Sequence, residues 1–209
     1  MERYASLERS FLKRHYYPHL AITLLICLLS GGIMSFRNLT QSQAAQVMEM
    51  YVALTGIVLF TPLFLPEQDR EIWRLEQSKA APMWKLYLLR TVTSFAAQAV
   101  VVTAFVGILA FKNDGLAAWV LWRGSYCQVV FLGSLGYFVS ALTNQAVVGY
   151  MISILYYAAN VGISNRLGCF GLFQMMRGRD GFEIPMLAAA LVLFSLGAAL
   201  REIISRRNN

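Results

Sequence analysis

Six long apolar segments constrain the fold of this chain more than any other feature. They cover residues 17–36, 47–65, 86–111, 116–142, 146–163 and 185–203. A helix needs about 20 residues to cross a hydrocarbon core about 30 Å thick, and each segment is close to or above that length. None shows the alternation of a membrane β-barrel strand. We therefore expect an all-α membrane protein, with six transmembrane helices in a single transmembrane domain over residues 1–209.

The charged residues support this interpretation. Hydrophobic residues make up 57% of the chain and charged residues only 14%, too few to cover a water-soluble surface. The net charge is +7, but the cations flank the apolar segments, which favours contact with anionic lipid over nucleic acid. We expect no cleavable signal peptide, because the first apolar segment is too long and no small-residue cleavage site follows it.

The distribution of Lys and Arg predicts an orientation. Six spans place both termini on one side, and the positive-inside rule makes the more basic side cytoplasmic. One side holds twelve cations: Arg3, Arg9, Lys13, Arg14, Arg70, Arg74, Lys79, Lys85, Arg90, Arg201, Arg206 and Arg207. The other side holds six: Arg37, Lys112, Arg123, Arg166, Arg177 and Arg179. The sequence thus predicts cytoplasmic termini in a multi-pass protein of the plasma (inner) membrane.

The N-terminal segment, residues 1–16, has the pattern of an amphipathic helix. Tyr4, Leu7, Phe11 and Leu12 share one helical face, and basic residues lie mostly on the other. This pattern is typical of a helix on the cytoplasmic membrane surface. An ordinary basic flanking segment is the alternative.

The largest cytoplasmic loop, residues 66–82, has the charge pattern of a short helix. Acidic Glu67, Asp69 and Glu71 come early, and basic Arg74 and Lys79 come late, which suits the helix dipole. Such a charged helix between two spans can dock another protein, although a solvated loop remains the alternative.

Two further segments differ from plain spans. Small residues near the end of the fourth span allow helices to approach closely: Gly133, Gly136, Ser140 and Ala141. The outer segment 164–184 is too short to span and rather apolar, so we expect it to be partly re-entrant or interfacial.

Catalytic and metal-binding patterns are not found in the sequence. It has no phosphate-binding G-x-x-x-x-G-K-[ST] loop, and its two histidines, His15 and His19, lack a third ligand. We also expect no Asp or Glu in the middle of a span, which argues against a proton-coupled pump. The few polar residues inside the spans either line a pathway or bond neighbouring helices, and the second role is favoured: Thr55, Gln98, Gln128 and Asn160.

The order of these features resembles the permease subunits of type 2 ABC exporters. An amphipathic helix precedes six spans, and a Pro-Glu-led charged segment continues into Ser-Lys-Ala-Ala-Pro-Met-Trp-Lys at 78–85. The fourth span ends in a pattern that resembles that of the family, formed by Gly136, Ser140, Ala141 and Leu142. Residues 72–77 depart from the family's pattern, so the resemblance indicates no substrate subfamily.

The resemblance implies a non-enzymatic transport subunit. The 66–82 segment would be the coupling helix docked on a separate ATPase subunit, which holds the ATP and magnesium, while this chain carries no cofactor. Two permeases, identical or related, would pair and export an amphiphilic substrate: a peptide, a drug or a lipid-linked molecule. The docking contacts would be Glu67, Asp69, Arg70, Glu71 and Arg74. Two alternatives stay open: the substrate-binding membrane subunit of an energy-coupling vitamin importer, and a membrane assembly protein with no transport role.

Overall fold

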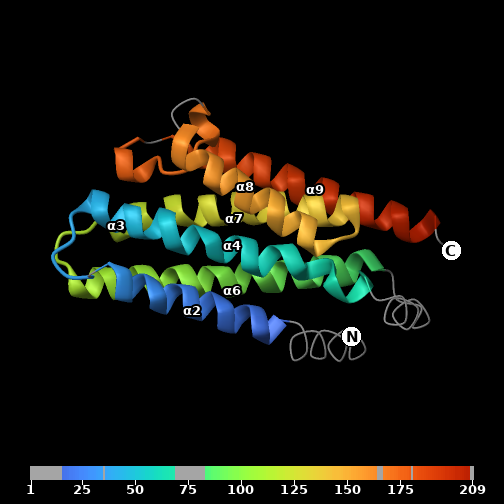
Figure 1. Cartoon of the computed structure of the whole chain (residues 1–209), viewed down its shortest axis with the longest axis horizontal. Coiled ribbons are helices and arrows are strands. Elements are labelled where there is room, and N and C mark those ends of the chain that lie inside the picture. The colour runs from blue at the N-terminus through green and yellow to red at the C-terminus, as the bar shows by residue number, and fades with distance from the viewer. Residues whose placement is uncertain (1–15, 35, 69–82, 164–166, 180, 208–209) are drawn as a thin grey trace.

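The computed structural model describes residues 16–34, 36–68, 83–163, 167–179 and 181–207 (Figure 1). These residues form an all-α bundle, with no strand in the described ranges. Residues 1–15 and 69–82 lie outside them, so the expected amphipathic helix and most of the expected coupling helix do too.

The helices follow the apolar segments closely. The first is α2, Tyr17–Ile33. The second is a rod of four stacked parts: α3 (Gln41–Val47), the π-helical turn η2 (Met48–Val52), α4 (Ala53–Phe60) and the 3₁₀ helix η3 (Thr61–Gln68). The remaining elements are α6 (Met83–Lys112), α7 (Ala118–Thr143), α8 (Ala146–Ile163), the short 3₁₀ turns η5 (Gly168–Phe170) and η6 (Met175–Arg177), and α9 (Glu183–Arg207).

Four of these helical stretches are long and apolar enough to cross a membrane. They are Gln41–Pro66, Trp84–Lys112, Ala118–Thr143 and Glu183–Ile204. Two more, Tyr17–Ile33 and Ala146–Gly162, are apolar but shorter. The chain therefore has the helices of a membrane protein, and the expected count of six depends on the two shorter ones.

On two outer helices, α2 and α8, polar side chains face the interior of the bundle and large apolar side chains face outward. In α2 the buried side chains are Thr23 and Ser30, whereas Leu28 is 76% exposed and Ile33 is 66% exposed. In α8 Ser153 is fully buried and Leu155 is 60% exposed. Such apolar outer faces are unfavourable in water, and they suit helices whose outer surface meets lipid.

Helix α7 lies at the centre of the bundle and packs against α4, α6, α8 and α9 (Figure 1). Close approach depends on glycine: a Cβ on Gly133 would lie 2.8 Å from the carbonyl oxygen of Gly56, and one on Gly149 would lie 2.6 Å from that of Gly136. The prediction that small residues near the end of α7 allow tight packing is confirmed. Gly56 on α4 and Gly149 on α8 complete the contact from the facing helices.

Two arginines that were counted among the twelve cytoplasmic cations are buried within the bundle. Arg90 lies inside α6, is 1% exposed and donates to the carbonyl oxygen of Leu63. Arg201 is 4% exposed, donates to Asn144 Oδ1 at 2.5 Å and lies over the ring of Phe64. Long side chains such as these can reach oxygens at the ends of neighbouring helices, so burial does not leave their charge unsolvated.

Candidate functional site

A buried carboxylate, Glu49, lies inside the second helical stretch. The stretch begins at Gln41 because Thr40 and Gln43 form a capping box, in which Thr40 Oγ1 accepts from the Gln43 amide and Gln43 Oε1 accepts from the Thr40 amide. Glu49 is thus the ninth of the 26 residues of Gln41–Pro66. We expected no Asp or Glu in the middle of a span, and the predicted span 47–65 placed Glu49 at its edge. The helix starts earlier than its apolar residues indicate, so Glu49 lies well inside it.

Three hydrogen-bond donors converge on the Glu49 carboxylate. Oε1 accepts from Gln128 Nε2 of α7 at 2.5 Å and from the Met175 amide at 2.8 Å. Oε2 accepts from the Met176 amide at 3.0 Å. The Glu49 side chain is fully buried, and hydrogen bonds to an ionised carboxylate are about twice as strong as neutral ones. The arrangement supports a carboxylate that fixes the turn η6 to η2 and α7.

The backbone around Glu49 is also unusual. Residues Met48–Val52 form a π-helical turn, a feature that is rare and is concentrated at functional sites. Inside this turn the Met50 carbonyl oxygen accepts a 2.7 Å hydrogen bond from the Tyr157 hydroxyl of α8. The π turn thus joins the second helical stretch to α8 as well as to η6.

Residues 167–179 of the predicted segment 164–184, hereafter the outer segment, fold back onto the helices. Ser42 Oγ donates to the Met176 carbonyl at 2.7 Å, and Tyr156 donates to the Phe170 carbonyl at 2.6 Å. Leu172 and Phe173 are buried. The segment was expected to be partly re-entrant or interfacial. Its position relative to the lipid stays a prediction, but Leu172 and Phe173 pack on protein, whereas Phe170 is exposed.

The four polar residues expected inside the spans all make hydrogen bonds. Gln98 Nε2 of α6 donates to Thr55 Oγ1 of α4 at 2.7 Å. Asn160 of α8 accepts from the Leu172 amide at 2.8 Å, and Gln128 donates to Glu49. The structure thus brings Thr55 and Gln98 together, and places Gln128 and Asn160 at the outer segment. Each contact joins two different elements, as helix-bonding residues do.

The arrangement of the expected docking residues stays a prediction. Glu67 lies in η3, and Asp69, Arg70, Glu71 and Arg74 lie outside the described residues. In Figure 1, the end of η3 and the start of α6 lie at the end of the bundle opposite α3. The helix α4 separates η3, which holds Glu67, from the π turn that holds Glu49.

Sequence reasoning also missed the ion pair between Arg123 and Glu183. Arg123 was counted only as one of the six cations on the less basic side. Its Nε and terminal nitrogen donate to Glu183 Oε1 at 3.1 and 2.8 Å. Glu183 Oε2 accepts from the Gly181 amide at 3.2 Å. The pair joins α7 to the first turn of α9, next to the outer segment.

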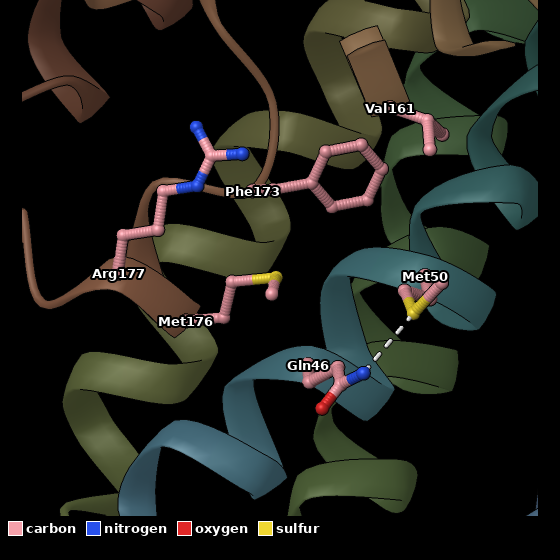
Figure 2. Close-up of a pocket in the computed structure, with 6 residues that line it drawn as sticks. All are labelled: Gln46, Met50, Val161, Phe173, Met176 and Arg177. Atoms are coloured by element: carbon pink, nitrogen blue, oxygen red, sulfur yellow. Dashed lines mark hydrogen bonds between the residues drawn. The ribbon is translucent and has the colours of Figure 1, made fainter. Parts of the chain in front are cut away.

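A cavity of about 110 Å³ opens beside the π turn (Figure 2). Three elements supply its walls: the second helical stretch, α8 and the outer segment. Figure 2 shows the Phe173 ring pointing toward Val161, with Arg177 on the far side of the ring. The lining residues are Gln46, Met50, Val161, Phe173, Met176 and Arg177.

Comparisons with known proteins do not assign the chain to a family. No protein-family model matches it, and neither a curated protein nor a solved structure matches it. The functional interpretation therefore depends on the residues and their geometry.

Proposed function

We propose that the chain is the membrane-spanning permease subunit of an ATP-driven ABC exporter. In this proposal it crosses the plasma (inner) membrane six times, with both termini in the cytoplasm. It pairs with a second permease and with two separate ATPase subunits that bind ATP and magnesium. The substrate class is amphiphilic: a peptide, a drug or a lipid-linked molecule.

The observation behind the proposal is the position of the chain's connections. The start of α2, the end of η3, the start of α6 and the end of α9 all lie toward the end of the bundle opposite α3 (Figure 1). A helix docked on a cytoplasmic ATPase must lie on the side that carries most of the cations. The two helices that flank residues 69–82 therefore meet that connection at the end where the described chain begins and finishes, which supports the coupling role proposed for residues 66–82.

The packing inside the bundle supports pairing with a second permease. Thr55 and Gln98 bond each other, and Gln128 bonds Glu49, so these polar groups are used between helices. A substrate pathway then fits better at an interface between two chains than through the middle of one. The same observation weighs against the vitamin-importer alternative, which needs a deep polar pocket.

Glu49 raises a second candidate, a proton-coupled transporter, because intramembrane carboxylates commonly carry protons. Its geometry weighs against that role. Gln128 and two backbone amides of the outer segment donate to it, so the carboxylate joins three parts of the described chain. A group used in this way as a packing contact is poorly placed to exchange protons with a pathway, so we assign Glu49 a structural role.

Reversing two loop charges tests the exporter proposal. We expect Glu67→Lys combined with Glu71→Lys to lower the ATP hydrolysis that co-purifies with the tagged chain by about tenfold, because charged pairs at a docking site are commonly worth more than 1.4 kcal/mol. Asp114→Lys, an exposed acidic residue at the other end of the bundle, is the control and should leave the activity unchanged. Equal co-purifying activity in all three proteins would refute the coupling-helix assignment.

A further inference from the structure

We propose that the cavity beside the π turn binds one anionic phospholipid from the adjacent leaflet. Its phosphate lies at Arg177, and the first part of an acyl chain lies between Phe173 and Val161. This proposal concerns a lipid site at the bundle surface and does not depend on the exporter function.

The walls of the cavity suit a hydrocarbon chain. Four of the six lining residues are apolar: Met50, Val161, Phe173 and Met176. Methionine side chains are flexible and polarisable, so they adapt to chains of different shape. Of the two polar lining residues, Gln46 already directs its Nε2 to the Met50 sulfur at 3.6 Å. The apolar walls favour an amphiphile over a free inorganic anion.

The cavity is accessible from the lipid side of α8. Val161 is 58% exposed and lies on the same helix as exposed Leu155, whereas Asn160 between them is fully buried. The apolar face of α8 therefore leads directly to the cavity. An acyl chain can enter sideways from the bilayer without crossing an aqueous space.

Arg177 gives the cavity its charge preference. It is exposed, lines the cavity and is the final residue of the turn η6. The turn is fixed by the Met175 and Met176 amides on Glu49, and Arg177 interacts electrostatically with the same carboxylate. Arginine at the outer end of a membrane bundle lies at the depth of lipid phosphates, which its planar group binds in a bidentate manner.

The backbone at Phe173 supports a binding role for this wall. Phe173 has a φ of 64°, a left-handed conformation that is strained for a bulky side chain. Its ring is held at 5.6 Å from that of Tyr157 in an edge-to-face contact. Strain of this kind is concentrated at ligand-binding and active sites. Here it fixes the aromatic ring at the cavity wall.

Native mass spectrometry of the purified chain tests the proposal, with phosphatidylglycerol and phosphatidylcholine as the lipid probes. We expect one phosphatidylglycerol to be retained, and Arg177→Gln to weaken its binding about tenfold. Arg179→Gln removes the same charge two residues away, outside the cavity lining, and should bind as the native chain does. Val161→Trp fills the cavity and should prevent binding, whereas Leu155→Trp, elsewhere on the exposed face of α8, should not.

Four results would overturn the proposal. The first is equal retention of phosphatidylglycerol and phosphatidylcholine. The second is an equal loss of phosphatidylglycerol binding in Arg177→Gln and Arg179→Gln. The third is retention by Val161→Trp at the native level. The fourth is displacement of the lipid by inorganic phosphate at matched ionic strength, because that would identify a free-anion site instead. A folding defect is recognised separately, by comparing the thermal unfolding of each variant with that of the native chain.

Discussion

Replacing Glu49 with leucine is expected to lower the free energy of unfolding by about 3–5 kcal/mol, the usual cost of removing one partner from a buried charged contact. The substitution leaves Gln128 Nε2 and the Met175 and Met176 amides without their acceptor. These donors come from α7 and from the outer segment, so both contacts should weaken together. Thermal and denaturant unfolding in detergent measure the loss.

Two further variants define the origin of the effect. Glu49→Gln keeps the shape and one acceptor oxygen, so its loss should be smaller, at about 1–3 kcal/mol. Asp114→Asn removes an exposed carboxylate and should change little. The outer segment should also loosen in Glu49→Leu, which faster thiol labelling of exposed Cys169 would report. A Glu49→Leu protein as stable as Asp114→Asn would contradict the anchoring role.

The second large effect is expected at Gly56, where α4 meets α7. A Cβ at this position would overlap the backbone carbonyl oxygen of Val129. Backbone cannot rotate away as a side chain can, so Gly56→Ala must separate the two helices. We expect a loss of about 1–3 kcal/mol, the usual cost of overpacking a core, measured by the same unfolding experiments.

Gly107→Ala is the matched control for Gly56→Ala. Gly107 lies in α6, and a Cβ there would meet nothing within 4 Å. Alanine in the middle of a helix is preferred over glycine by about 0.5–1 kcal/mol, so this variant should be neutral or slightly stabilised. Similar losses in both variants would mean that close packing at Gly56 does not matter.

Apolar length was sufficient to predict the helices. The prediction for 146–163 matches α8, and the third span, predicted at 86–111, is observed as Met83–Lys112. The agreement has a physical reason: backbone groups in an apolar environment must bond within the segment, so a long apolar run has few alternatives to a helix. Small residues likewise predicted the tight contacts of α7.

The buried charges were harder to predict. The sequence does carry a signal for the start of the second helical stretch. Thr40 and Gln43 form a capping-box pattern, which places Glu49 well inside the helix. Its partners were not, because Gln128 lies 79 residues away and Met175 lies 126 residues away in the chain. Arg90 was counted as a cytoplasmic cation near the start of the third span, and its burial depends on contacts such as that with the Leu63 carbonyl oxygen, 27 residues away. Contacts that depend on how distant helices pack leave no local pattern.

The central claim is that the bundle crosses the bilayer with the outer segment outside and the α7–α8 turn in the cytoplasm. Cys169 is exposed in the outer segment, whereas Cys127 is buried in α7. Gln145 is exposed in the turn between α7 and α8, at the opposite end of the bundle (Figure 1). In the proposed orientation, these two positions lie on opposite sides of the membrane.

Labelling of intact cells with a membrane-impermeant maleimide tests the claim most directly. We expect Cys169 to be labelled in intact cells, and Cys169→Ser to remove that labelling. In the Cys169→Ser background, Gln145→Cys should be labelled only after the membrane is permeabilised. Labelling of both positions from the same side of the membrane would contradict the account.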